Sequence, residues 1–156
     1  MPALPPAPGT APLPDWPAVQ VDGLAAGRLV LKVAAGRPVI LLSAPGIAGL
    51  AGAGWWAELA TAWRGEAGQA PFLPLLDVVD MPGQALAALR AGVSAIAFTP
   101  GPTTPDGVLE RLAGLAAAHG ACLYPVPPVS IQPCWTRNRD AVLQQWLMQQ
   151  LGFQGL

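Results

Sequence analysis

Two carboxylates, Asp77 and Asp80, stand three residues apart at the end of the apolar stretch FLPLLDVV (72–79). A carboxylate in such a position can act as a general base, and two together can share a divalent cation. The sequence supplies no third ligand near them, so no metal site is predicted. The competing interpretation is that both residues cap the following turn and helix, which is a common role of Asp at such positions.

Other polar residues end neighbouring apolar stretches in the same way. Ser43 ends the first, Thr99 the third and Tyr124 the fourth. In parallel α/β folds, ligands bind at the carboxyl ends of the strands. This rule selects Ser43, Asp77, Thr99 and Tyr124 without any motif. With the glycines and the threonine of the adjoining loops, the candidate ligand-binding residues are Ser43, Gly46, Thr99, Gly101 and Thr103. Gly101 and Thr103 would hold the phosphate group of a small anionic metabolite.

The segment GAGWWA (52–57) fits a relaxed dinucleotide fingerprint, Gly-x-Gly-x-x-Ala. In that motif the first glycine follows its strand at once, whereas Gly52 comes nine residues after Ser43. The nearer APGIAG (44–49) has Pro45 in the turn, which removes one backbone N–H donor. We therefore favour a plain strand–helix connection, and the sequence assigns no cofactor.

The remaining reactive side chains offer little material for nucleophilic catalysis. His119 is the single histidine and stands next to Gly120 at the expected end of a helix, where the helix dipole stabilises it. Cys122 and Cys134 are twelve residues apart without a second pair, so they form no zinc pattern. Two free thiols are typical of a reducing compartment, and we expect a cytoplasmic protein.

Four apolar stretches alternate with helix-forming segments along the middle of the chain. They are short and lack polar alternation, which is typical of strands in a parallel sheet covered on both faces. The predicted strands are 38–44, 72–79, 94–100 and 122–126. The predicted helices are 22–36, 52–67, 81–92, 104–120 and 139–153.

This alternation predicts an α/β fold, either a small four-stranded parallel sheet or half of a (β/α) barrel. Residues 1–17 contain seven prolines and are expected to form a solvated tail with few contacts, apart from Trp16. The α/β domain is expected at 18–134. A C-terminal helical segment at 135–156 is expected to pack on this domain or to form a dimer interface.

The stretch ALRAGVSAIAFTPG (88–101) resembles the late βα unit of the 2-keto-3-deoxy-6-phosphogluconate aldolases, in which Ala-Gly precedes a strand ending in a Pro-Gly phosphate loop. Those enzymes form a Schiff base with a strand lysine, but the only lysine here, Lys32, lies outside every predicted strand. The stretches LLSAPG and PGQALAALRAG also resemble short uncharacterised bacterial α/β proteins, which implies a fold and no activity.

The composition excludes several classes of partner. Only 11% of the residues are charged, and the basic residues form no cluster, so no surface for nucleic acid or for an anionic membrane is expected. Pro, Gly or charged residues interrupt every apolar run well before the roughly 18 residues that a membrane-spanning helix needs. The low charge also predicts an apolar surface patch that a partner or a second subunit covers.

The tryptophans suggest how the chain assembles. In the helix at 52–67, Trp55 and Trp63 lie on one stripe, whereas Trp56 is expected to point towards solvent. Trp146 lies on the apolar side of the C-terminal helix. That helix either anchors a homodimer through Trp146 or folds back over its own sheet.

These observations favour a small cytoplasmic α/β protein that binds a ligand or a partner without chemistry of its own. The alternative is a lyase or isomerase that acts on a small phosphorylated or carboxylated metabolite, with Asp77 or Asp80 as the base. The lack of a strand lysine and of a catalytic histidine favours the first function. A pocket at the strand ends containing Ser43, Asp77 and Thr99 would favour the second.

Overall fold

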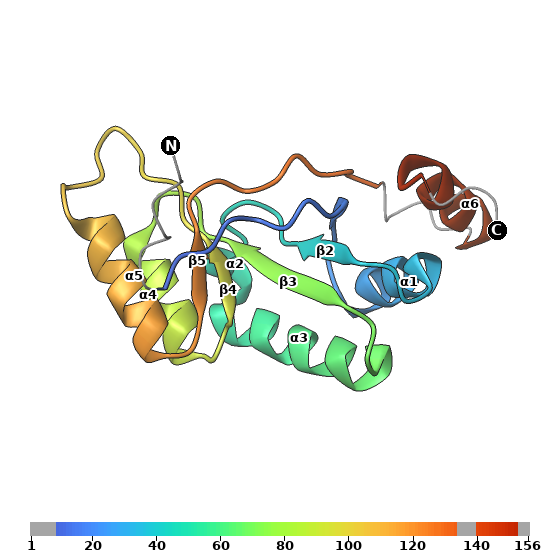
Figure 1. Ribbon diagram of the computed structural model, residues 1–156, viewed down its shortest axis with the longest axis horizontal. Helices are drawn as coiled ribbons and strands as arrows, with labels where there is room; N and C mark the ends of the chain where they lie inside the picture. The colour runs from blue at the N-terminus through green and yellow to red at the C-terminus, as the bar shows by residue number, and fades with distance from the viewer. Residues whose placement is uncertain (1–8, 134–139, 153–156) are drawn as a thin grey trace, which may run out of the picture.

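Strands and helices alternate through the part of the chain that a computed structural model describes, residues 9–133 and 140–152 (Figure 1). The described elements are β1 (Ala18–Gln20), α1 (Leu24–Ala34), β2 (Val39–Leu42), α2 (Ala48–Ala51), α3 (Ala53–Ala67), β3 (Phe72–Asp77), α4 (Pro82–Arg90), β4 (Ala95–Ala97), α5 (Val108–Ala118), β5 (Cys122–Tyr124) and α6 (Asp140–Gln150). Each predicted helix and strand is present. The sequence pattern misses β1, because this strand has only three residues and follows a proline-rich segment.

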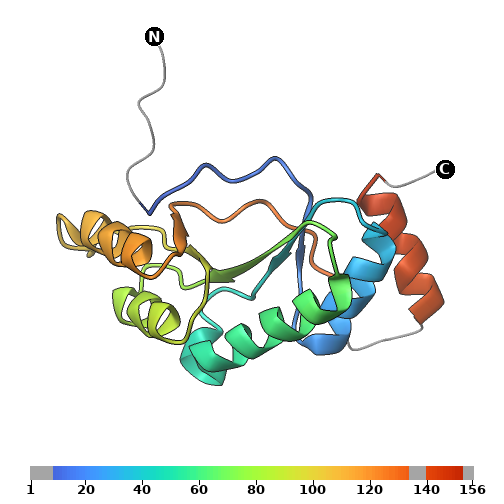
Figure 2. The same ribbon diagram turned by 60° about the horizontal axis from the view of Figure 1, so that its bottom comes forward.

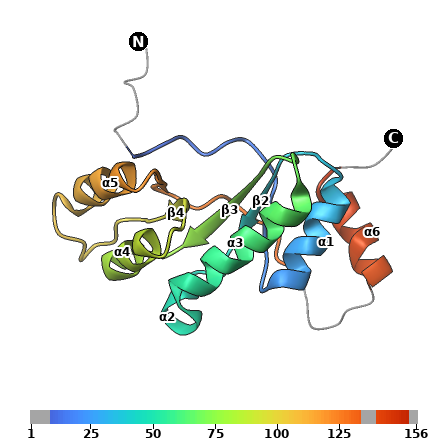
Figure 3. The ribbon, with the colours of Figure 1, turned by 90° about the horizontal axis from the view of Figure 1, so that it is seen from below.

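The strands form one parallel sheet in the order β1-β2-β3-β4-β5. The parallel pairing of the four predicted strands is confirmed, and β1 extends the sheet beyond β2. Because strand order follows chain order and βαβ crossovers are right-handed, α1, α3, α4 and α5 gather on one face, the helix-covered face (Figure 3). Both faces of the sheet are covered, as the sequence pattern predicts, but these helices cover only one of them.

The larger core lies between the sheet and the helices of the helix-covered face. Trp56 and Trp63 are fully buried there, and their rings meet edge to face with centroids 5.3 Å apart. The expectation that Trp56 points towards solvent is wrong. The buried stripe of α3 includes Trp56, Leu59, Ala60 and Trp63, a helical i, i+3, i+4, i+7 pattern. Trp55 is only partly buried at its margin.

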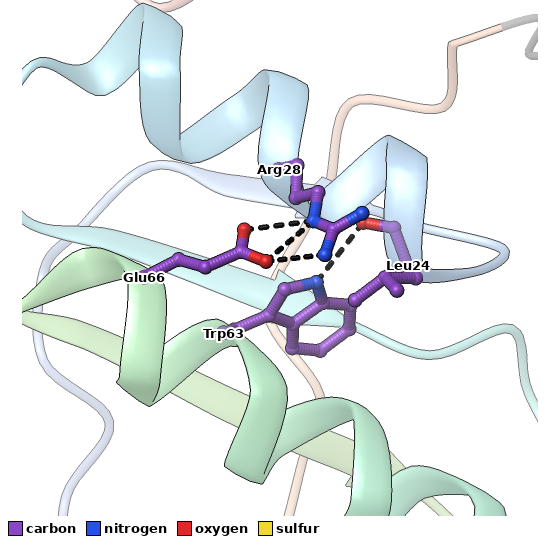
Figure 4. A network of polar contacts seen from close by, with 4 residues as sticks. All are labelled: Leu24, Arg28, Trp63 and Glu66. Carbon is purple, nitrogen blue, oxygen red and sulfur yellow. Dashed lines mark hydrogen bonds and ion pairs between the residues drawn. The ribbon is translucent and has the colours of Figure 1, made fainter.

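The helices α1 and α3 pack closely against each other around Trp63 (Figure 4). The indole N–H of Trp63 donates to the backbone oxygen of Leu24 over 3.2 Å. Gly27 permits this approach, because a Cβ at its position would lie 2.2 Å from the Trp63 ring. On the surface, Arg28 Nε donates to both carboxylate oxygens of Glu66, at 2.6 and 2.8 Å, and this bonding lowers the pKa of Glu66. Both charges are exposed, so the pair contributes little to stability.

The opposite face, called here the segment-covered face, carries a smaller core with many short side chains: Ala18, Ile40, Leu42, Leu75, Ala95, Ala97 and Tyr124. Residues 9–17 run across it in an extended conformation, and Ala11, Leu13 and Trp16 pack against it (Figure 2). The expectation of a solvated tail is therefore wrong for residues 9–17. Their prolines favour extended backbone, which suits a segment that crosses strands. Residues 1–8 lie outside the described part.

Both edges of the sheet are covered by the chain itself. Beside β5, the N–H of Leu123 donates to the oxygen of Gly9, and the N–H of Ala11 donates to the oxygen of Leu123, at 2.7 and 3.3 Å. Beside β1, Ile131 forms a parallel bridge with Val19, with two backbone hydrogen bonds of 2.8 and 2.9 Å. Unpaired strand edges invite pairing with other chains, so these bridges protect the sheet.

The C-terminal helix α6 packs against α1 of its own chain (Figure 1). Leu147 and Leu151 are buried in the larger core, whereas Trp146 is 36% exposed. The helix thus folds back on its own chain, although it covers α1 rather than the sheet, and the homodimer stays a prediction. Within the described ranges, no helix has both the length and the apolar character needed to span a membrane.

Candidate functional site

Ser43, Asp77 and Thr99 lie at one edge of the sheet, as their positions in the sequence predict. Ser43 directly follows β2, Asp77 ends β3, and Thr99 comes two residues after β4. These three strands are neighbours and run parallel, so their carboxyl ends meet at the same edge. This is the edge at which parallel α/β folds bind their ligands.

Asp77 and Thr99 face the same side of the sheet. Both chain neighbours of Asp77 belong to the larger core, so the strand's alternation turns Asp77 towards the segment-covered face. Phe98 also belongs to the larger core, so Thr99 turns the same way. The N–H of Thr99 donates to the oxygen of Val79 over 2.7 Å. Thr99 is therefore aligned two residues beyond Asp77 on the neighbouring strand.

Asp77 is a buried carboxylic acid, only 4% exposed. Its Oδ1 accepts the backbone N–H of Val79 over 2.9 Å, and no described residue donates to Oδ2. Burial raises the pKa of Asp77, and the hydrogen bond from Val79 offsets part of the rise. A carboxyl with a raised pKa is better able to take up and release a proton near neutral pH, as acid–base catalysis requires.

Val79 has a φ of 56°, in the left-handed region that a β-branched residue rarely adopts. Its N–H is bonded to Asp77 and its oxygen to Thr99, so the strained residue links the two polar side chains of the edge. Such conformations cost about 1–3 kcal/mol and are concentrated at functional sites. Sequence reasoning misses Val79 because valine gives no signal for this conformation.

The hydroxyl of Ser43 is engaged within the protein. Ser43 is fully buried, its Oγ accepts the N–H of Asp77 over 2.9 Å, and it donates to the oxygen of Ala44 over 3.1 Å. The side chain therefore replaces a backbone bond between β2 and β3. In the structure, Ser43 positions Asp77 and has no proton left to donate to a ligand.

The two glycines expected to bind a ligand, Gly46 and Gly101, donate their N–H groups to the protein instead. The N–H of Gly46 donates to the backbone oxygen of Asp77 over 3.0 Å, and that of Gly101 donates to Thr104 Oγ1 over 2.9 Å. Gly101 also lies against the carboxylate of Asp80, because a Cβ at Gly101 would be 2.5 Å from Asp80 Oδ2. The N–H of Gly101 is therefore used within the protein, and the carboxylate of Asp80 lies beside it. Thr103 is exposed in the same loop.

The interpretation that Asp77 and Asp80 cap the following turn and helix is correct for the turn but not for the helix. Met81 is the N-cap residue of α4 and no side chain bonds to the helix start, so neither Asp77 nor Asp80 caps this helix. Asp77 caps the turn through Val79. Among the residues that the structure describes, no three His, Cys, Asp or Glu side chains come together to hold a metal ion.

Tyr124 shares a row of the sheet with Asp77. The strand registers align Asp77 with Ala97 and Ala97 with Tyr124, and the small alanine separates the two polar side chains. Burial raises the pKa of the Tyr124 hydroxyl, and the neighbouring Cys122 raises it further, so the phenol stays protonated at neutral pH. Cys122 is a free thiol, and Cys134 lies outside the described residues.

The glycine segment 52–57 is a connection between helices, not a phosphate loop. The short helix α2 follows β2, and Gly52, with a φ of 84°, separates α2 from α3. Gly54 lies inside α3. The prediction of a plain strand–helix connection is therefore wrong in one respect, because α2 lies between β2 and α3. His119 is the C-cap residue of α5, as its position predicts, with Nδ1 at 2.8 Å from the oxygen of Leu115.

The side chain of Thr99 lacks a hydrogen-bond partner within the described part of the chain. Its Oγ1 is buried and has no hydrogen-bond partner within the described ranges. A buried polar atom without a partner costs about 1–3 kcal/mol, and native proteins rarely leave one unsatisfied. A ligand that reaches the segment-covered face beside Asp77 would supply the missing partner.

The fold and this edge define an all-parallel α/β protein whose helices cover one face of its sheet. Comparison of the chain with protein-family models, with curated proteins and with solved structures finds no match. The similarity of residues 88–101 to the aldolases and the cytoplasmic location therefore stay predictions. The function has to be inferred from the geometry of the site itself.

Proposed function

We propose that the protein binds a small polar molecule at the carboxyl edge of the sheet, between Asp77 and Thr99, and performs no chemistry on it. The observation that carries this proposal is the buried hydroxyl of Thr99, which has no partner among the described residues. Buried hydroxyls in native proteins are nearly always hydrogen-bonded. A ligand hydroxyl or amino group beside Asp77 would complete the bonding.

The charges at this edge favour a neutral or cationic ligand. Asp77 and Asp80 are both acids, and the N–H groups of Gly46 and Gly101 are already used within the protein. A hydroxyl or amino donor can bond to Oδ2 of Asp77, which accepts from no described residue, while the same ligand bonds to Thr99. We therefore replace the small anionic metabolite expected from the sequence by a polyol or a small amine.

Asp77 also favours a second candidate function, a lyase or isomerase in which it acts as the acid–base residue. Its burial and raised pKa suit this role, and the protonated Tyr124 of the same row could donate a proton. A Schiff-base mechanism has no support here, because Lys32 is exposed on α1, on the other side of the sheet. Such an enzyme would use Asp77 or Asp80 as the base, with Tyr124 as a proton donor.

The binding proposal is tested by native mass spectrometry of the purified protein and by thermal shift with a panel of polyols and small amines. We expect at least one compound to raise the Tm, since a ligand at about 100 times its Kd stabilises the folded state by about 2.7 kcal/mol. The shift should be lost in Thr99→Val and kept in Thr103→Val, a matched change at an exposed residue of the same loop. An equal shift in Thr99→Val, or no shift with any compound, would contradict the proposal.

Asp77→Asn separates the two candidate functions once a compound has been found. If the protein only binds, NMR spectra of the compound stay unchanged during prolonged incubation with the wild-type protein. If Asp77 is catalytic, the wild-type protein converts the compound, and Asp77→Asn binds it without conversion. Asn can still accept the N–H of Val79, so the turn is preserved in the variant.

A further inference from the structure

A polar cavity lies away from the proposed ligand site, under α3 and beside the amino ends of β3 and β4. Its volume is about 130 Å³. The cavity exists because β3 and β4 pair only at Leu76 with Ile96 and at Asp77 with Ala97. Pro74, two residues before this pairing, has no N–H to donate to β4, so the strands stay unpaired there.

Hydrogen-bond donors are concentrated in the lining of this cavity. Trp56 lines it, is fully buried, and has an indole N–H without an acceptor among the described residues. Arg64, two turns further along α3, lines it as well and donates from Nη2 to Ser94 Oγ over 3.1 Å. A guanidinium has five N–H donors, so Arg64 retains others for a ligand. An acceptor placed between Trp56 and Arg64 would satisfy both.

The rest of the lining limits the charge and the size of such an acceptor. Glu58 also borders the cavity, and its negative charge opposes a doubly charged anion more than a singly charged one. Apolar side chains form much of the remaining wall: Ala57, Ala60, Pro74 and Val93. Thr61 lines the cavity as well, and its hydroxyl donates to the oxygen of Ala57. The combination of two donors, one nearby carboxylate and a short apolar wall suits a monoanion with a small alkyl part.

We propose that this cavity binds the carboxylate of a small organic acid such as propionate. The carboxylate oxygens accept from the indole N–H of Trp56 and from the guanidinium of Arg64, and the alkyl group packs against Pro74 and Val93. Carboxylates are good partners for a guanidinium, because its planar donors match their two oxygens. This site is independent of the proposed function, because it lies at the other end of the strands and on the other face.

The proposal is tested by two-dimensional NMR of the indole N–H groups in the full ¹⁵N-labelled chain. Sodium propionate is titrated against sodium chloride at constant ionic strength. Trp56→Phe identifies the resonance of Trp56, because it removes this N–H and keeps an aromatic ring. We expect the Trp56 signal to shift in a saturable manner, since a new acceptor changes the environment of its proton.

Arg64→Gln provides the decisive variant, because Arg64 is exposed and its replacement leaves the core intact. We expect about tenfold weaker propionate binding, which corresponds to about 1.4 kcal/mol. Arg111→Gln removes the same charge from an exposed position on α5 and should leave the affinity unchanged. Inorganic phosphate, titrated in the same way, should bind more weakly than propionate because of Glu58.

Several outcomes would overturn the proposal. A Trp56 signal that does not shift with propionate would mean that water is its acceptor. The same shift with sodium chloride alone would show an effect of salt rather than of a carboxylate. Equal propionate affinity in Arg64→Gln and in the wild-type protein would show that the guanidinium does not contact the ligand. Tighter binding of phosphate than of propionate would contradict the choice of a carboxylate as the ligand.

Discussion

The two faces of the sheet are covered by different kinds of structure, helices on the helix-covered face and an extended segment on the segment-covered face. On the first face, amphipathic helices press large side chains such as Trp56 and Trp63 onto the strands. On the second face, an extended segment lays partly buried side chains, among them Leu13 and Trp16, over strand residues that are mostly small or aliphatic. A helix bonds its own backbone and can give a whole side to packing, whereas an extended segment cannot. Apolar packing is thus concentrated on one face, while Asp77 faces the other.

The largest effect is expected from a change on the helix-covered face. Trp63→Ala removes a fully buried ring and its hydrogen bond to Leu24, so the free energy of unfolding should fall by about 3–5 kcal/mol. Urea denaturation measures this loss. Trp16→Ala is the matched change on the segment-covered face and should cost clearly less, because Trp16 is only partly buried. Equal losses at the two positions would mean that the two faces are packed alike.

An intermediate effect is expected when the segment is shortened. Deletion of residues 2–14 exposes the smaller core and breaks the pairing of Gly9 and Ala11 with Leu123. We expect a loss of about 2–3 kcal/mol and, for a chain of this length, a fall in Tm of about 5–10 °C. Thermal unfolding followed by circular dichroism measures this change. An unchanged Tm would contradict the packing of this segment and support a solvated tail with few contacts.

Gly9→Ala sharpens the same test with a single substitution. Gly9 has a φ of 80°, and a Cβ at its position would lie 1.9 Å from the backbone oxygen of Ala113 in α5. The segment can escape this clash by detaching from the sheet, so the loss of stability should reach at most that of the deletion. A larger loss than the deletion causes would show that the clash spreads into α5.

The smallest effect is expected at Asp77, the buried carboxyl that faces the segment. Because burial raises its pKa above the ordinary 3.8, the folded protein binds this proton more tightly than the unfolded chain does. The associated stability is present below pH 3.8 and is lost as the pH rises through the raised folded value. Asp77→Asn should therefore raise the stability at neutral pH and flatten its dependence above pH 3.8, as measured by urea denaturation across this range. A loss of stability at neutral pH would show that the ionised carboxyl is stabilised in the folded state.

Much of the helix-covered half was predictable from local patterns. A strand without polar alternation and a helix that ends near glycine can each be recognised from a few consecutive residues, as in the segments 38–44 and 81–92. The orientation of α3 was not predictable in this way. Trp55 and Trp56 are both spaced from Trp63 as members of a helical stripe would be, and only the docking of α3 on the sheet decides which one is buried.

The segment-covered half and the details of the site depend on contacts between distant residues. Proline content predicts extended backbone, but it does not show that the segment crosses a sheet. The carboxyl edge was predictable because strand ends set it. The bonding of each polar group was not predictable. The bond from the N–H of Asp77 to Ser43 Oγ, and the lack of a partner for the Thr99 hydroxyl among the described residues, arise only when neighbouring strands meet.

The bridge between residues 9–11 and Leu123 has a consequence for the synthesis of the protein. The segment is synthesised before the strand with which it pairs, and that strand follows more than a hundred residues later. Chains are synthesised at about 5–20 residues per second, so one apolar face of the early strands stays uncovered for several seconds. Ile131, which protects the edge at β1, arrives later still. This segment is therefore synthesised early but paired late, and the nascent protein has to avoid aggregation until the pairing forms.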